Sequence, residues 1–239
     1  MSNPVISVII PTYNRFEYLI QAIKSVKQQK YENIEIIVVN DHSTDEKYYE
    51  YNWKNENIIF KTTKYRSKEI YGFPCAAYVR NEGVEISNGS FIAFLDDDDL
   101  WLENKTDDHI IPFIEESKCS KNSLSSSDGY WGNKPNRYLP TEKYVRYNEE
   151  KYSHYILSKY KMESWPNILT KNEIAIHNSI VTSSVIVHSK LFKKIGFPIL
   201  PNGQEDYQCW LNCLQHTNLR YYNMPTFYYD DAHGYGRNY

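Results

Sequence analysis

A short apolar segment that runs straight into four carboxylates constrains the fold of this chain more than any other feature. Phe91–Leu95 is apolar throughout, and it is followed by Asp96, Asp97, Asp98 and Asp99. An apolar run of this length is too short to span a membrane, and it predicts a strand buried on both faces of a sheet. Four adjacent carboxylates repel one another, which raises their pKa values or attracts a cation. Oxygen-only ligands of this kind suit a hard divalent ion, Mg²⁺ or Mn²⁺.

The alternative interpretation of the four aspartates is a solvated acidic turn. A helix could begin after Trp101, and acidic side chains also favour helix N-termini. The patterns in the rest of the chain are needed to choose between these two interpretations, a cation-binding site and a capping turn.

The overall composition narrows the class of protein. A length of 239 residues allows a substantial core, and 41% hydrophobic with 24% charged residues is ordinary for a soluble globular protein. The net charge of -3 argues against general nucleic-acid binding, which needs a basic surface. No stretch is long and apolar enough for a transmembrane segment, and the N-terminus lacks a signal-peptide pattern, so a cytoplasmic location is expected. Scattered cysteines without a Cys-x-x-Cys pair predict free thiols.

The first hundred residues alternate between strand-like and helix-like patterns. Strands are predicted at Val5–Pro11, Ile34–Asn40, Ile58–Phe60 and Phe91–Leu95, and helices at Asn14–Val26, Lys47–Tyr51 and Pro74–Ser87. This alternation predicts a mostly parallel sheet with helices on both faces. Ligands of such sheets bind beyond the carboxyl ends of the strands. Thr12, Asp41 and the four aspartates all follow a strand, so the sequence predicts a polar site at that rim.

The second half of the chain has weaker patterns. We expect a helix at Glu103–Glu116 with a break near Pro112, a loop at Lys118–Ser127, a strand at Ile180–Val187, and helices at Ser189–Ile195 and Gln204–Gln215. The segment Asp128–Lys171 shows little periodicity and receives no assignment. Since no repeat or linker separates the halves, we expect one domain over residues 1–239.

Four segments together resemble the motifs of family 2 glycosyltransferases, and they occur in that family's order and spacing. They are Val8–Asn14, Val38–Asp45, Arg80–Gly83 with Gly89–Asp99, and Gly203–Leu211. The resemblance implies an α/β fold of the GT-A (Rossmann-like) type, with a mostly parallel sheet flanked by helices and a less regular acceptor side. It also implies that residues 1–101 bind a nucleotide sugar and that residues 102–239 bind the acceptor.

The activity that the resemblance implies is inverting transfer of one sugar from a nucleotide sugar, usually a UDP-sugar, to a hydroxyl group. The acceptor would be a carbohydrate, a glycoprotein or a glycolipid, and the cofactor would be Mn²⁺ or Mg²⁺. The Gln-x-x-Arg-Trp signature and the membrane helices of processive members are missing, which points to transfer of a single sugar. The arginine that often follows the base helix is also replaced, by Asn212-Cys213.

The resemblance assigns donor residues one by one. It places the nucleotide base among Pro11, Thr12, Tyr13 and Asp41, and it assigns Arg80, Asn81, Asp96 and Asp97 to the rest of the donor nucleotide. Asp96 and Asp98 fit the family's Asp-x-Asp (DXD) pattern, in which Asp98 ligates the metal, and Asp99 matches a third family position. Asp97 replaces a usually small residue, so it could be merely solvated. His233 is the candidate that completes the metal shell.

Several of these assignments have structural alternatives. Asp41 could simply form an Asx turn, since its side chain can accept hydrogen bonds from the main chain two residues on. Arg80 and Asn81 could be an ordinary exposed helix pair, and His233 could be an ordinary loop residue.

Asp206 matches the family's catalytic base, which removes the proton from the attacking hydroxyl. Glu205 would orient that base or bind acceptor. The alternative for both is that they complement the dipole in the first turn of a helix.

Aromatic residues between the donor motifs and the base are expected to bind the acceptor. Trp131 and Trp165, with the Tyr-rich run from Tyr138 to Tyr160, can stack on the apolar faces of sugars. The alternative is that they fill the core of the second half.

Two rival functions share parts of this pattern. Sugar-phosphate nucleotidyltransferases have a related sheet, but they carry a Gly-rich basic loop after the first strand, where this chain has Pro-Thr-Tyr-Asn-Arg. The second rival is a catalytically inactive nucleotide-sugar-binding module. The presence of Asp98 and Asp206 argues against it.

Overall fold

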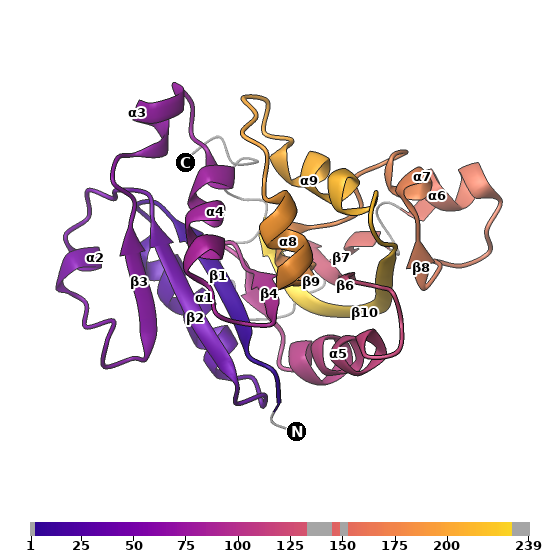
Figure 1. The fold of residues 1–239 in the computed structure, drawn as a ribbon, viewed down its shortest axis with the longest axis horizontal. Coiled ribbons are helices and arrows are strands. Elements are labelled where there is room, and N and C mark those ends of the chain that lie inside the picture. The colour runs from indigo at the N-terminus through magenta and orange to yellow at the C-terminus, as the bar shows by residue number, and fades with distance from the viewer. Residues whose placement is uncertain (1–2, 133–144, 149–152, 231–239) are drawn as a thin grey trace.

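The computed structural model describes residues 3–132, 145–148 and 153–230, which form one mixed sheet with helices on both faces (Figure 1). The strands are β1 (Ile6–Thr12), β2 (Ile34–Asn40), β3 (Ile58–Thr62), β4 (Phe91–Phe94), β5 (Leu100–Trp101), β6 (Leu124–Gly132), β7 (Val145–Arg146), β8 (Ile168–Leu169), β9 (Ile186–His188) and β10 (Leu219–Asp230). Their order in the sheet is β3-β2-β1-β4-β9-β6-β10-β5, with β7 beside β6 and β8 beside β10.

The helices connect and cover this sheet. They are α1 (Phe16–Lys27), α2 (Lys47–Glu50), α3 (Ser67–Tyr71), α4 (Ala76–Ile86), α5 (Ile111–Ser117), α6 (Ser153–Tyr160), α7 (Lys171–Ile174), α8 (Ser189–Ile195) and α9 (Glu205–Cys213). A π-helical turn at Thr106–Ile110 precedes α5, and a 3-10 turn at Thr182–Ser184 precedes β9. Within the described ranges, every helix is too short or too polar to cross a bilayer.

The parallel half of the sheet follows from its sequence pattern. β1 pairs in parallel with β2 and β4, and β2 pairs in parallel with β3. Side chains alternate between the two faces of a strand, so Ile9 packs in the same cluster as Val79 of α4. Val8 lies on the opposite face, in the cluster that holds Leu19 of α1. Because both faces are covered, these strands are almost continuously apolar, and the predicted α/β fold is confirmed.

The second half of the sheet is mixed, and it departs from the predictions. β9 runs antiparallel to β4 and β6, while β10 runs parallel to β6 and antiparallel to β5. The predicted strand Ile180–Val187 is wrong in its first part, because Thr182–Ser184 forms a 3-10 turn and only Ile186–His188 is extended. Leu219–Asp230 received no prediction, yet it forms the long curved strand drawn in yellow in Figure 1. The register of β10 shifts on both sides of Pro225, which breaks the usual alternation.

The predicted loop Lys118–Ser127 is wrong in its last part, because β6 begins at Leu124. Ser125 and Ser127 look like loop residues in the sequence, but their hydroxyls are paired inside the fold. Ser125 bonds the buried His109 at 2.6 Å, and Ser127 bonds Thr226 of β10 at 2.6 Å. A polar segment can form a central strand when its buried hydroxyls have partners.

Trp165 lies in the core and not on a binding surface. Only 6% of its side-chain and main-chain area is exposed, and its ring lies 5.4 Å from the ring of buried Tyr221. Of the two expectations for this residue, the structure supports core packing rather than acceptor binding.

Trp165→Ala should therefore destabilise the fold by about 3–5 kcal/mol, the usual cost of deleting a buried tryptophan side chain. Urea unfolding followed by circular dichroism measures this. Tyr65→Ala, at a side chain that is 52% exposed, serves as the control, and it should change stability by about 0.5 kcal/mol or less. Equal, small effects of both substitutions would contradict the placement of Trp165 in the core.

Candidate active site

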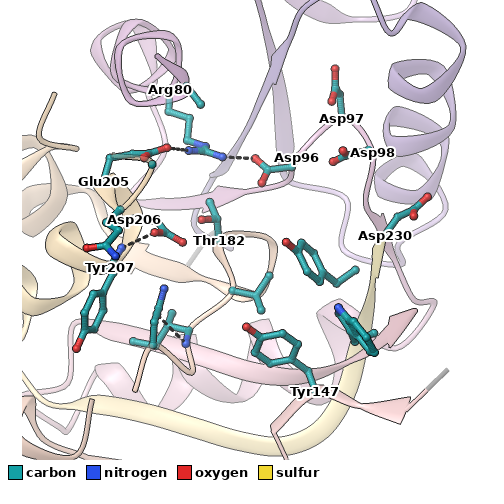
Figure 2. Close-up of a pocket in the computed structure, with 18 of the residues that line it drawn as sticks. Arg80, Asp96, Asp97, Asp98, Tyr147, Thr182, Glu205, Asp206, Tyr207 and Asp230 are labelled. Carbon is teal, nitrogen blue, oxygen red and sulfur yellow. Dashed lines mark hydrogen bonds and ion pairs between the residues drawn. The ribbon is translucent and has the colours of Figure 1, made fainter. Parts of the chain in front are cut away.

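A cavity of about 340 Å³ opens where β4 ends, between the two halves of the sheet (Figure 2). Its charged lining residues are Arg15, Arg80, Asp96, Asp97, Asp98, Glu205, Asp206 and Asp230. Its other side chains include Trp131, Tyr147, Thr182, Tyr207 and Tyr229. The predicted residues of the acidic strand end and of the first turn of α9 thus meet in one cavity, although about a hundred residues separate them in the chain.

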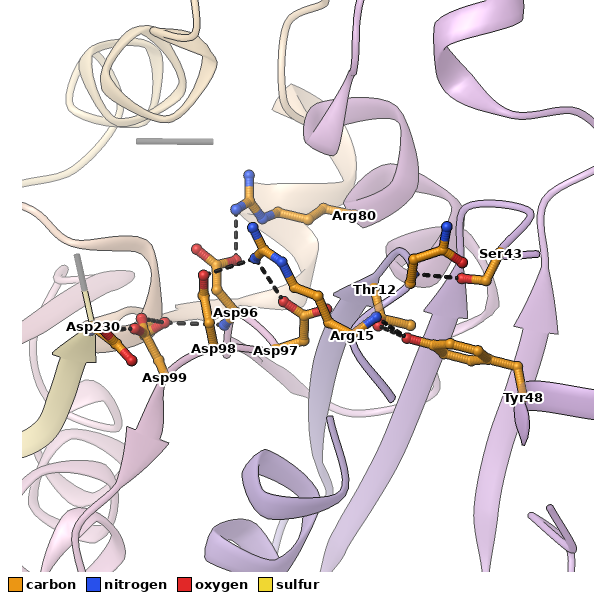
Figure 3. Close-up of polar contacts among 12 residues, drawn as sticks. Thr12, Arg15, Ser43, Tyr48, Arg80, Asp96, Asp97, Asp98, Asp99 and Asp230 are labelled. Atoms are coloured by element: carbon orange, nitrogen blue, oxygen red, sulfur yellow. Dashed lines mark hydrogen bonds and ion pairs between the residues drawn. The ribbon is translucent and has the colours of Figure 1, made fainter. Parts of the chain in front are cut away.

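The acidic turn, residues Asp96–Asp99, is held by arginines. Arg80 Nη2 lies 2.6 Å from Asp96 Oδ1, and Arg15 Nη1 lies 2.7 Å from Asp98 Oδ2 and 3.2 Å from Asp97 Oδ1 (Figure 3). Asp97 is buried, with 1% of its area exposed. Burial, and after it the charge of Asp98, raises the pKa of Asp97 to about 7. The turn is therefore neither a solvated loop nor a simple helix cap.

Arg15 is a site residue that the sequence analysis did not assign. Its main-chain N–H donates to the hydroxyl of Tyr48 at 2.8 Å, and that hydroxyl also bonds Thr12 Oγ1 at 2.7 Å (Figure 3). The preceding Asn14 has a positive φ of 51°, and its side chain accepts a hydrogen bond from the N–H of Thr44 at 2.9 Å. These contacts fix the turn after β1 and aim a guanidinium at the acidic turn. The sequence offered one clue, because Arg15 follows the predicted strand end closely.

The predicted nucleotide-base residues lie near the ends of β1 and β2. Asp41 is buried, and its carboxylate accepts hydrogen bonds from the N–H and the hydroxyl of Ser67 at 2.7 and 2.6 Å. Burial raises the pKa of Asp41, while these hydrogen bonds from Ser67 oppose that shift. The guanidinium of Arg66, another residue that the sequence analysis missed, lies 4.0 Å from the ring centre of Tyr13. Pro11 is buried within β1.

Asn81 has a different position from its neighbour on α4. Its side-chain amide donates to the carbonyl of Phe197 at 2.8 Å and accepts from the N–H of Phe197 at 2.9 Å. It therefore ties α4 to the segment after α8, and it is absent from the residues that line the cavity. Arg80, by contrast, is buried and lines the cavity between Asp96 and Glu205, which lies 3.4 Å from its Nη1.

Asp206 lies in the first turn of α9 and faces the cavity (Figure 2). Its Oδ1 accepts a hydrogen bond from the N–H of Tyr207 at 2.6 Å. Burial, and after it the charge of Glu205, raises the pKa of Asp206 to about 6. A carboxylate with a pKa in this range can take a proton near neutral pH, as a general base must.

Three aromatic side chains, Trp131, Tyr147 and Tyr229, form what we call the aromatic wall of the cavity. Trp131 and Tyr229 are register partners in neighbouring strands β6 and β10. The rings of Tyr147 and Tyr229 meet edge to face, with their centres 6.0 Å apart. Trp131 was expected from the sequence, and Tyr147 lies in the Tyr-rich run Tyr138–Tyr160 that was expected at the acceptor site, whereas Tyr229 was not expected. Trp165 is not part of this wall.

The side chains that line the cavity have the right chemistry to bind a hard divalent cation, but they are not arranged as a complete metal site. Among the described residues, six carboxylates and two arginines line it, so negative charge is in excess there, and carboxylate oxygens are the ligands that Mg²⁺ and Mn²⁺ prefer. Across the described residues, no three carboxylate, histidine or cysteine side chains are arranged to hold an ion. His233 lies outside the described residues.

Solved structures with similar architecture identify the fold of this chain. One is Staphylococcus aureus TarS residues 1–349 in complex with UDP, with a TM-score of 0.68, 20% identity, and coverage of 95% of this chain and 60% of that one. Another is the mannosyltransferase PcManGT from Pyrobaculum calidifontis in complex with GDP-Man and Mn²⁺, with a TM-score of 0.60, 15% identity, and coverage of 94% and 56%. The chain has the GT-A fold of these glycosyltransferases.

The sequence relatives give the family. The chain matches the model of Glycosyl transferase family 2 over residues 7–177. It is 30% identical over 232 residues to the UDP-Glc:alpha-D-GlcNAc-diphosphoundecaprenol beta-1,3-glucosyltransferase WfaP of Escherichia coli. The aligned region covers 94% of this chain and 76% of that protein. Some curated relatives are much longer, and the chain spans only 15% of one of them. This chain belongs to glycosyltransferase family 2, a family of transferase enzymes.

The raised pKa of Asp206 predicts a pH-dependent effect of Asp206→Asn on stability. Above about pH 6 the ionised carboxylate destabilises the folded state, because its folded pKa of about 6 exceeds the ordinary value of 3.8. The variant should therefore melt at a higher temperature than the wild type at about pH 8. Its advantage should shrink as the pH falls from about 6 to about 4, since the carboxyl is then protonated in both states. Scanning calorimetry over this range measures it, and a constant difference at every pH would contradict the shift.

Proposed function

We propose that this chain transfers one sugar from a UDP-sugar to a hydroxyl group of its acceptor, with inversion at the anomeric carbon. The observation that carries the proposal is the position of Asp206, a carboxylate with a pKa of about 6, in the same cavity as the arginine-held acidic turn. One side of such a cavity can bind a nucleotide diphosphate, and the other can activate a hydroxyl group.

In this proposal residues 1–101 bind the donor. Asp41 accepts a hydrogen bond from the imide N–H of uracil, since its oxygens keep lone pairs beyond those used by Ser67. Tyr13 and Arg66 supply flat faces against which a base can stack. Pro11 and Thr12 would lie beside the base at the end of β1, and the UDP complex of the similarly folded TarS supports the choice of nucleotide.

The diphosphate would lie near the acidic turn. Asp98 and Asp96 would hold Mn²⁺ or Mg²⁺, which supplies neutralising charge for the diphosphate as it leaves. The Mn²⁺ complex of the similarly folded mannosyltransferase supports this cofactor. Arg80 and Arg15 add fixed positive charge to the same region, while Asp97 keeps Arg15 in place. His233 stays a predicted further ligand.

Asp206 would act as the general base. It removes the proton of the acceptor hydroxyl while that oxygen forms its bond to the anomeric carbon and the diphosphate departs. A single base with direct attack gives inversion and needs no covalent enzyme intermediate. Glu205, held by Arg80 at 3.4 Å, would keep the first turn of α9 in place beside the base or contact the acceptor.

The aromatic wall would bind a sugar unit of the acceptor. Trp131 and Tyr229 offer apolar faces, and tyrosine hydroxyls can meet the polar rim of a sugar ring. The name of the relative WfaP describes an acceptor in which a sugar is attached to a lipid diphosphate. That supports a glycolipid acceptor whose sugar residue enters this cavity.

Donor binding should require a divalent cation, because six carboxylates outnumber two arginines among the cavity residues that the structure describes, and they would repel a diphosphate. We expect the dissociation constant of UDP, measured by calorimetry, to rise at least about tenfold in EDTA, a loss of about 1.4 kcal/mol. Asp98→Ala should remove this dependence on the ion. Equal UDP affinity with and without Mn²⁺ in the wild type would contradict the role of the metal.

Asp206→Asn should lose sugar transfer by about 10²–10⁴-fold, the contribution expected of a general base. UDP affinity should stay close to that of the wild type, since Asp206 is assigned to the acceptor side. In the wild type, kcat/KM should fall as the pH drops below about 6, because the protonated carboxyl cannot accept a proton. Normal turnover of the variant would move the base elsewhere, with Glu205 as the next candidate.

Trp131→Ala should raise the acceptor KM, because a stacking face for the acceptor sugar is removed. Transfer to a panel of alkyl glycosides with a fixed UDP-sugar measures this. UDP affinity and the unfolding free energy should change little, in contrast to Trp165→Ala. Joint loss of stability and UDP binding in Trp131→Ala would show that this residue is part of the core.

A further inference from the structure

Ser183 lies in the 3-10 turn Thr182–Ser184, directly behind the acidic turn. Its hydroxyl oxygen accepts a hydrogen bond from the main-chain N–H of Asp96 at 3.0 Å. The same hydroxyl donates its proton to Oδ2 of Asp99. Ser183 is fully buried and does not line the cavity, although its neighbour Thr182 does.

Asp99 extends this contact to a third segment of the chain. It is fully buried, and its Oδ1 accepts a hydrogen bond from the main-chain N–H of Asp230 at 3.0 Å (Figure 3). Asp230 ends β10, and both it and Tyr229 line the cavity. One buried carboxylate therefore joins the end of β10 to the 3-10 turn, and the serine hydroxyl joins that turn to the end of β4.

The 3-10 turn is itself held firmly from the other side. The indole N–H of Trp101 donates to the carbonyl of Ser183 at 3.3 Å, and the buried Lys105 donates to the carbonyl of Ser184 at 2.8 Å. The serine is thus a fixed support for the two segments that it touches.

We propose that Ser183 and Asp99 are positioning residues, which set the donor carboxylates and the aromatic wall at a fixed separation. The inference rests on the proposed function of the cavity. Asp96, on the donor side, is bonded to Ser183 at one end of this hydrogen-bonded pair. Asp230, which follows Tyr229 on the acceptor side, is bonded to Asp99 at the other end. A small misplacement of reacting groups can lower the rate of an enzyme by about 10²-fold, and a buried carboxylate with both oxygens bonded resists such movement.

Ser184 provides a matched control within the same turn. It is also fully buried, and its hydroxyl also makes two hydrogen bonds, to the carbonyl of Val181 at 2.6 Å and to Ser126 Oγ at 3.0 Å. Neither partner belongs to the acidic turn. Both Ser183→Ala and Ser184→Ala should lower the urea midpoint, since each deletes one buried hydroxyl, and Ser183→Ala should lower it more because it removes a partner of the buried carboxyl of Asp99.

Only Ser183→Ala should affect the cavity. We expect it to raise the dissociation constant of UDP with Mn²⁺ by about tenfold and to lower kcat for sugar transfer by about 10–100-fold. Ser184→Ala should leave both within about twofold of the wild type. Equal effects of the two substitutions on UDP binding and kcat would overturn the positioning role. If the wild type transfers no sugar, the proposed function is wrong instead. The effects of the two substitutions on UDP affinity would then still test the positioning role.

Amide hydrogen exchange tests the same contacts without any substrate. The N–H groups of Asp96 and Asp230 should exchange slowly in the wild type and in Ser184→Ala, and faster in Ser183→Ala. If Ser183→Ala does not fold, the exchange rates of the two amides in the wild type still test the proposed hydrogen bonds. Exchange of both amides at the rate of an exposed loop would contradict the proposed hydrogen bonds.

Discussion

The structure depends on providing partners for the carboxyl groups that are buried where β4 ends. Asp97 and Asp99 have 1% and 0% of their area exposed, and an unpaired buried charge costs several kcal/mol. The partners that relieve this cost come from distant parts of the chain: Arg15 after β1, the hydroxyl of Ser183, and the main chain at the end of β10. Compensating the acidic turn therefore also assembles the cavity.

The parallel half of the fold could be predicted from sequence because its strands are buried on both faces. β1, β2 and β4 consist mainly of Ile, Val, Phe and Ala, and helices with a 3.6-residue period separate them. The antiparallel half could not be predicted in this way. β6 carries three buried serines whose partners lie on other elements, and β10 contains Pro225 with shifted register on both sides. In both strands, tertiary hydrogen bonds replace the apolar alternation on which sequence patterns depend.

The candidate site was predictable where a residue type follows a strand end or opens a helix. Asp96, Asp98 and Asp206 meet such criteria, and they face one cavity in the structure. Arg15 and Tyr229 did not stand out, because their importance depends on which distant group each one meets. Trp165 shows the opposite error, since an aromatic side chain looks the same in sequence whether it packs in a core or lines a cavity. The sequence shows that aromatic residues are present, but it does not show whether each one faces the core or the cavity.

The most direct test of the account follows the anomeric configuration of the sugar that leaves the donor. A panel of α-linked UDP-hexoses would be incubated with the protein and Mn²⁺ in the absence of acceptor, with UDP release and the anomer first formed both followed by proton NMR. Slow release with the β-anomer appearing first is the predicted result, because water would replace the acceptor and attack opposite the diphosphate with Asp206 as base. Release of the α-anomer first, or tight donor binding without any release even when acceptors are added, would contradict the account.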